Sequence, residues 1–162
     1  MKINLSTKPE ILTLPSTILV YVEKIGPFMQ TAPQAWQELW KVIGPGTAEI
    51  RPKQMMGLSR IDPSKEGDEA MTYQAAVSVD QVPKSLPKPL ISRNFISATF
   101  AKFLLTGSYA QLAHAYPQAI ERTEAAGHKM RPGFFIEIYL NTPDKTAEKD
   151  LLTEIYVPVS LQ

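Results

Sequence analysis

The order of apolar and polar residues predicts a strand, a helix and two more strands in the first half of the chain. Residues 16–23 (STILVYVE) are rich in β-branched and aromatic side chains, which is typical of a strand. A helix then begins near Thr31 and ends at Gly44-Pro45-Gly46. Its apolar residues recur at helical spacing at Trp36, Leu39, Trp40 and Ile43. Alternating residues predict two further strands, at 54–61 and 71–79.

The second half repeats this order of elements. Residues 96–105 predict a strand and residues 109–126 a helix, which Gly127 ends. One face of that helix carries Leu112, Tyr116, Ala119 and Thr123. The closing strands are predicted at 134–141 and 151–159. The two halves are joined by a stiff connector, residues 81–90, which is rich in proline.

The repetition extends to individual residues. The stretch 51–80 recurs without a gap as 131–160. Residues match at turns and at the boundaries of elements, for example Arg51-Pro52 and Arg131-Pro132. The chain is therefore predicted to be one α+β domain over residues 1–162, built from duplicated βαββ units at about 15–80 and 95–160. We expect an antiparallel sheet with pseudo-twofold symmetry, helices on one face and a central ligand cleft.

Composition narrows the classes of function. The 162 residues are 44% hydrophobic and 20% charged, as in an ordinary globular domain. The net charge of +1 gives no reason to expect direct binding of nucleic acid. No cysteine is present and no apolar run approaches the length of a membrane span, so a cytoplasmic protein without membrane contact is expected. His114 and His128 have no metal-ligand spacing, and we expect neither a metal nor a cofactor.

Candidate chemistry is concentrated in the last two predicted strands. Alternation along FFIEIYLN predicts that Ile136, Ile138 and Leu140 face the helices. In LLTEIYVPV, the residues from Leu151 to Val159 at odd positions are the expected core. If both apolar sets are buried together, one opposite face collects two carboxylates and two phenols: Glu137, Tyr139, Glu154 and Tyr156. A solvated polar face of an antiparallel sheet would show the same alternation.

The two halves differ at these four positions. The first half carries Gly57, Ser59, Gln74 and Ala76 where the second carries the Glu and Tyr residues. Clustered carboxylates attract a cation, and tyrosine rings add cation–π attraction. The asymmetry predicts a cleft with small residues on one wall and Glu and Tyr on the other. Phe28 and Tyr109, which follow the turn glycines, are candidates for its rim, whereas Trp36 and Trp40 are predicted to be core.

The chain resembles the GyrI-like small-molecule-binding domains, which also serve as effector-binding domains of AraC-type and MerR-type transcription regulators and share a fold with SOUL proteins. The resemblance rests on the order of several segments: Val20-Tyr21-Val22, Gly26-Pro27-Phe28, Ala35-Trp36-Gln37-Glu38-Leu39-Trp40, Gly57-Leu58, 135–140 and 153–159. It implies a cleft that binds amphiphilic, often cationic aromatic compounds. It also implies that Glu137, in the sequence Glu-Ile-Tyr, neutralises the charge of the ligand.

Three hypotheses follow. The leading one is a stand-alone domain that binds a small amphiphilic cation or aromatic compound through Glu137, Tyr139, Glu154 and Tyr156. The alternative, implied by the resemblance, is a hydrolase of cyclopropane-bearing aromatic toxins in which Glu137 and Glu154 share the acid and base roles. A third hypothesis is a protein partner, either DNA gyrase or a separate regulator. The resemblance implies an upstream DNA-binding segment in regulators, and this sequence starts almost at its first predicted strand.

Overall fold

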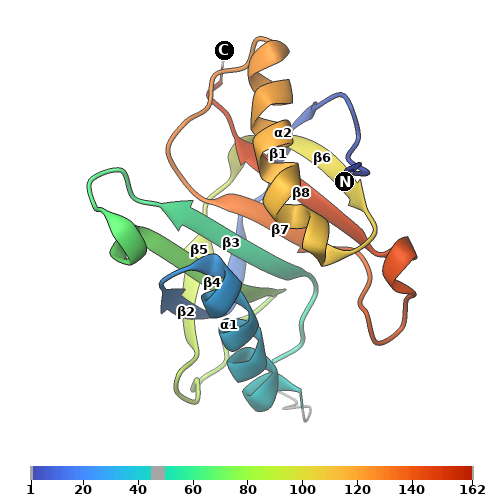
Figure 1. Cartoon of the computed structure of the whole chain (residues 1–162). Coiled ribbons are helices and arrows are strands. Elements are labelled where there is room, and N and C mark those ends of the chain that lie inside the picture. The colour runs from blue at the N-terminus through green and yellow to red at the C-terminus, as the bar shows by residue number, and fades with distance from the viewer. Residues whose placement is uncertain (1, 45–49, 162) are drawn as a thin grey trace. The chain divides into compact units, whose positions relative to one another are not determined.

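The computed structural model describes residues 2–44 and 50–161 and consists of two compact units (Figure 1). One unit is Ser16–Ile96, and the other combines Met1–Pro15 with Ser97–Gln162. Pro45 and Gly46, which were expected to end the first helix, lie outside the described residues. Each unit contains one α-helix and an antiparallel sheet, which confirms the predicted α+β class.

The unit Ser16–Ile96 has four strands in the order β3-β4-β2-β5, with the helix α1 packed on β2 and β4. Its elements are β2 (Thr17–Ile25), α1 (Phe28–Ile43), β3 (Met55–Ile61), the 3₁₀ helix η1 (Gly67–Ala70), β4 (Met71–Val79) and β5 (Ile91–Phe95). The helix begins three residues before the predicted Thr31, with Pro27 at its N-cap. Leu39 and Ile43 are buried against the strands, while Trp36 and Trp40 are partly buried at the side of this core.

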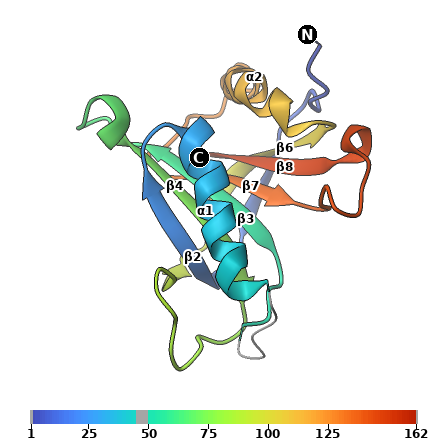
Figure 2. The same ribbon diagram turned by 60° about the horizontal axis from the view of Figure 1, so that its bottom comes forward.

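The second unit has the order β1-β6-β8-β7, and α2 packs on β8 and β6 (Figure 2). Its elements are β1 (Glu10–Leu14), β6 (Ala98–Thr106), η2 (Tyr109–Gln111), α2 (Leu112–Ala125), β7 (Phe135–Tyr139), η3 (Glu148–Asp150) and β8 (Leu152–Pro158). The predicted helix 109–126 is thus a 3₁₀ turn followed by an α-helix. Ala115, Ala119 and Thr123 of α2 are buried over the sheet.

Two strands, β1 and β5, were not predicted. Each precedes the first predicted strand of a half, so the repeated element order is ββαββ rather than βαββ. β1 pairs with β6, which belongs to the second half, and β5 pairs with β2, which belongs to the first half. Each compact unit therefore takes its edge strand from the other half of the sequence.

The pairing of the closing strands supports the duplication. Gly57 pairs with Ala75 in one unit, and Glu137 pairs with Ile155 in the other, so the eighty-residue offset preserves the register as well as the element order. The helices also match, because Ala35 of α1 and Ala119 of α2 are both fully buried. Within the described residues, neither helix is long and apolar enough to cross a membrane.

Candidate functional site

The register of β7 and β8 decides which side chains face α2. Glu137 pairs with Ile155, and Ile155 belongs to the apolar core under α2. Directly paired residues of an antiparallel sheet project from the same face, so Glu137 also faces the helix. The prediction that Ile136 and Ile138 form the helix-facing set is therefore wrong. These two isoleucines are buried, but they lie on the opposite face of the sheet.

The same register separates the four residues that were expected to share one face. Tyr139 pairs with Thr153 on the α2 face, next to Glu137. Glu154 and Tyr156 pair with Ile138 and Ile136, and therefore lie on the other face. The prediction assumed a register that differs by one residue, and a shift of one residue moves every side chain of a strand to the other face.

Glu137 is a buried residue, only 7% exposed. The hydroxyl group of Tyr116, on α2, donates a hydrogen bond to Glu137 Oε2. The hydroxyl group of Tyr139, on β7, donates to Oε1 at 2.6 Å. Among the described residues, no lysine, arginine or histidine forms an ion pair with this carboxylate. Glu137 is therefore hydrogen-bonded on both oxygens but not neutralised by a cation.

Aromatic rings surround this carboxylate. Tyr109, in η2, makes an edge-to-face contact with Tyr139 at a centroid distance of 5.6 Å. Tyr116 makes a similar contact with Phe135 at 5.8 Å. The four rings come from η2, α2 and β7, and each is partly exposed. We call Tyr109, Tyr116, Phe135, Glu137 and Tyr139 the Glu137 site.

Tyr116 was not among the predicted site residues, although the sequence placed it on the inner face of the second helix. No further role was predicted for this tyrosine, and Glu137 was expected on the sheet face opposite to the helix-facing residues. With the observed register, Tyr116 is one turn of α2 before the fully buried Ala119 and reaches the carboxylate. The useful signal was an aromatic residue with a hydroxyl group on the face of the helix that also carries Leu112 and Ala119.

Burial raises the pKa of the Glu137 carboxyl group above its ordinary value of 4.5, although the hydrogen bonds from Tyr116 and Tyr139 act to lower that pKa. Burial also raises the pKa of Tyr109, and the charges of Glu137 and Asp144 raise it further. A carboxyl group with a raised pKa holds its proton more readily than an exposed one. A cation bound near Glu137 would favour the ionised carboxylate and so act against the effect of burial on its pKa.

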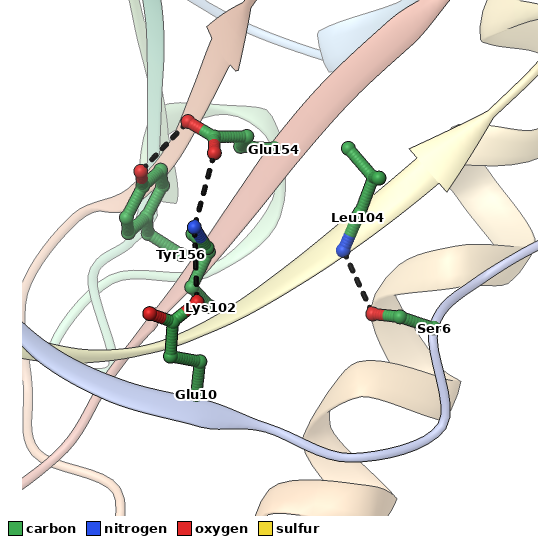
Figure 3. A network of polar contacts seen from close by, with 6 residues as sticks. All are labelled: Ser6, Glu10, Lys102, Leu104, Glu154 and Tyr156. Atoms are coloured by element: carbon green, nitrogen blue, oxygen red, sulfur yellow. Dashed lines mark hydrogen bonds and ion pairs between the residues drawn. The ribbon is translucent and has the colours of Figure 1, made fainter.

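The other face of the same sheet contains an ion-pair network (Figure 3). Lys102 Nζ lies 3.0 Å from Glu10 Oε2 and 3.2 Å from Glu154 Oε2, while Tyr156 donates to Glu154 Oε1 at 2.8 Å. The hydrogen bond to Glu10 is the main cause of the raised pKa of Lys102. Burial, followed by the contact with Glu154, raises the pKa of Tyr156. Glu154 is thus already neutralised by Lys102, unlike Glu137.

The predicted residues of the first half lie in the other unit. Gly57 and Ser59 pair with Ala75 and Tyr73, which belong to the core under α1. Gly57 therefore occupies the position of Glu137, so no carboxylate is present there. Phe28 lies 6.4 Å from the ring of Tyr73, whose hydroxyl group accepts a hydrogen bond from Trp36 Nε1 at 2.7 Å. This unit therefore also has aromatic side chains under its helix, but it lacks the carboxylate charge of Glu137.

Gln74 and Ala76 occupy the positions of Glu154 and Tyr156 on the face away from α1. Gln74 Nε2 donates to Glu23 Oε1 at 2.9 Å, and Arg93 Nη2 donates to Gln74 Oε1 at 2.8 Å.

Over residues 2–44 and 50–161, no group of three or more His, Asp or Glu side chains is arranged to hold a metal ion. The described chain therefore offers one buried, cation-free carboxylate, which is Glu137.

Solved structures with a similar fold include proteins that bind DNA or a cationic compound. The C-terminal domain of EcmrR has a TM-score of 0.73 and 19% identity, with 96% of this chain and 98% of that chain covered. EcmrR in a complex with DNA has a TM-score of 0.78 and 15% identity; 98% of this chain aligns, but only 59% of the EcmrR chain. SAV2435 bound to tetraphenylphosphonium has a TM-score of 0.66 and 18% identity, with 94% of each chain covered.

A crystal structure of a hydrolase from Listeria innocua is similar to the same degree, with a TM-score of 0.66, 15% identity, and coverage of 95% of this chain and 92% of that one. No curated protein sequence matches the chain. The family model of the GyrI-like small molecule binding domain, however, matches residues 7–160, which include the unit Ser16–Ile96, most of the other unit and the whole Glu137 site. The chain therefore belongs to the GyrI-like small-molecule-binding domain family.

Proposed function

We propose that this domain binds a small amphiphilic cation with aromatic groups, and that the carboxylate of Glu137 neutralises the charge of the ligand. The observation that carries the proposal is that Glu137, a residue only 7% exposed, accepts hydrogen bonds from two tyrosines and has no cationic partner within the described chain. A buried carboxylate that lacks a counterion is costly, so a bound cation stabilises it. The proposal replaces the expected Glu/Tyr quartet with the Glu137 site.

The aromatic rings suit the same ligand class. The partly exposed rings of Tyr109, Tyr139, Tyr116 and Phe135 provide apolar surface for a hydrophobic cation. Each cation–π contact contributes about 0.5–2 kcal/mol, depending on how far the cation is desolvated. The two phenol donors also hold the carboxylate in a fixed orientation, so little reorganisation is needed on binding.

Tetraphenylphosphonium is a suitable probe, because SAV2435 is a structural neighbour that has been solved with this compound bound. It is a hydrophobic cation that carries four aromatic rings and no hydrogen-bond donor. Binding of such a compound would fit either sequestration or sensing. The longer EcmrR, which binds DNA, contains a domain of the same fold.

The test compares two glutamates of the same sheet by isothermal titration with tetraphenylphosphonium. A cation centre about 6 Å from Glu137 would interact with it by about 3 kcal/mol at an effective dielectric constant of about 20. Glu137→Gln should therefore weaken binding about 100-fold. Glu154→Gln is the matched control, since Glu154 lies on the opposite face and is paired with Lys102. The Glu154→Gln variant should bind tetraphenylphosphonium with the affinity of the unmodified chain.

The neutral triphenylphosphine oxide provides a second control, because it retains phenyl rings without a net charge. Its affinity should be weak and insensitive to Glu137→Gln. Equal affinities of the unmodified chain and of Glu137→Gln for tetraphenylphosphonium would overturn the assignment of Glu137. Absence of tetraphenylphosphonium binding to the unmodified chain, at concentrations up to its solubility, would overturn the ligand class.

Hydrolysis is the second candidate function, and the raised pKa of Glu137 favours it. A buried carboxyl group with a raised pKa is suited to general acid–base catalysis near neutral pH. The paired mechanism with Glu154 does not fit, because the two carboxylates lie on opposite faces of the sheet. Glu137 would have to act without Glu154. Product formation from an aromatic cyclopropane compound, lost in Glu137→Gln but retained in Glu154→Gln, would support hydrolysis; stoichiometric binding without product would exclude it for that compound.

A further inference from the structure

We infer that the N-terminal segment, residues 2–6, sets the affinity of the Glu137 site, because it positions Tyr109 through the side chain of Gln111. This inference rests on the function proposed above and adds a positioning residue, Gln111, that does not itself belong to the site. It follows from hydrogen bonds that connect the N-terminal segment with η2 and α2 inside one compact unit. The segment, η2, α2 and β7 all belong to that unit.

The N-terminal segment extends β6 by a short stretch of strand-like pairing. Leu5 and Leu105 form an antiparallel bridge. The amide of Ser6 donates to Leu104 O at 2.9 Å, and the amide of Thr106 donates to Asn4 O at 3.0 Å. Leu104 also donates to the hydroxyl group of Ser6, as Figure 3 shows. The side chains of Ile3 and Leu5 are buried in the core under α2, which fixes the segment against the sheet.

Gln111 is the connection between this segment and η2. Its Oε1 accepts a hydrogen bond of 2.8 Å from the backbone amide of Asn4. Its Nε2 donates to Thr106 O at 2.9 Å, and a longer contact of 3.4 Å reaches Ser108 O. One carboxamide thus ties together the N-terminal segment, the end of β6 and the 3₁₀ turn. The other side-chain contacts of this turn are the Ser108 cap, which accepts from the amide of Ala110, and the ring of Tyr109.

Tyr109 begins that 3₁₀ turn, two residues before Gln111. Its ring packs edge-to-face on Tyr139, whose hydroxyl group donates to the Glu137 carboxylate. A change in the position of η2 therefore alters the aromatic surface beside the carboxylate. The chain of contacts runs from Asn4 through Gln111 and Tyr109 to Tyr139, with no step outside the unit.

A second set of hydrogen bonds connects the N-terminal segment with the Glu137 site through α2. Arg122 Nη1 donates to Leu5 O at 3.2 Å and to Ser6 O at 2.9 Å. Tyr116, on the same helix, donates to Glu137. The segment is therefore linked to both η2 and α2, whose tyrosines contact residues of β7. Coupling between two sites is reciprocal, so a ligand that orders Tyr109 and Tyr116 must also stabilise the N-terminal segment.

The first test is hydrogen exchange on the unmodified full chain, with and without saturating tetraphenylphosphonium. The amides of Asn4 and Ser6, which donate to Gln111 and Leu104, should exchange more slowly in the complex. Amides of β5, in the other unit, serve as the internal control and should not change. This readout requires no substitution and is independent of whether any variant folds.

The second test measures tetraphenylphosphonium affinity in variants of the Asn4–Gln111 contact. Gln111→Ala removes the carboxamide, and Asn4→Pro removes the amide that donates to it. Each should weaken binding by about 5- to 10-fold, the loss expected for a hydrogen bond of ordinary strength. Gln37→Ala, at an exposed position of α1, is the matched control and should bind like the unmodified chain.

The outcomes separate this inference from the proposed function. Tetraphenylphosphonium binding with unchanged exchange at Asn4 and Ser6, or with full affinity in Gln111→Ala, would overturn the inference and leave the proposed function intact. Failure of the unmodified chain to bind the probe would overturn both. Slower exchange together with weaker binding in both contact variants would establish the coupling.

Discussion

Replacing Tyr116 by Phe tests whether the Glu137 carboxylate depends on its hydrogen bond from α2. The substitution removes one hydroxyl group and retains the ring that packs on Phe135. A hydrogen bond to a charged group contributes about 1.5–3 kcal/mol, compared with about 0.5–1.5 kcal/mol for a neutral pair. Tyr116→Phe should therefore lower the free energy of unfolding by about 1.5–3 kcal/mol where Glu137 is ionised, and by less where it is protonated.

Urea denaturation at alkaline and acidic pH measures both values, and carboxyl-carbon NMR follows the pKa of Glu137 directly. That pKa should rise in Tyr116→Phe, because one of the two donors that lower it is lost. Tyr109→Phe is the matched control, since no hydrogen bond from the Tyr109 hydroxyl group is found within the described residues. An equal loss of stability in both variants, or an unchanged pKa of Glu137, would refute the reasoning.

Two further predictions concern charge. Because burial raises the pKa of Glu137 above 4.5, the folded state keeps a proton that the unfolded chain has lost, so stability should fall as the pH rises from 4.5 through that raised pKa. Glu137→Gln should remove this fall, which denaturation between about pH 4 and about pH 8 would reveal; identical slopes would contradict it. Lys102→Met should destabilise the fold by about 1 kcal/mol, near the upper end for exposed ion pairs, because the side chains of Lys102 and Glu154 are only 25% and 16% exposed. Lys53→Met removes a well-exposed pair with Asp80 and should lower the free energy of unfolding by less. Equal losses in the two variants would contradict the argument.

The sequence predicted the elements of each half because strands and helices leave local periodic patterns. Strands β3, β4 and β8 fall within one residue of the predicted limits. The buried faces of both helices also agree with the pattern, since Leu39 and Ala119 lie on the predicted stripes. The eighty-residue repeat predicted equivalent positions, and the equal registers of the two closing strand pairs confirm them.

The edge strands were missed for a physical reason. β1 and β5 have five residues each, and β5 follows directly on a connector rich in proline. Short edge strands carry weak alternation, and their pairing partners lie in the other half of the sequence. The N-terminal segment was overlooked in the same way, because its contacts with Gln111 and Arg122 join residues more than a hundred positions apart.

The sequence by itself determined the duplicated α+β order and singled out Glu137, because it stands in the second half where the first half has glycine. Only the tertiary structure decided what surrounds Glu137. Alternation assigns residues to two faces but does not say which face meets the helix, since that depends on the register of pairing between strands. The observed register turned Glu137 toward Tyr116 and left Glu154 beside Lys102. It thereby separated a carboxylate without a counterion from one that is already neutralised.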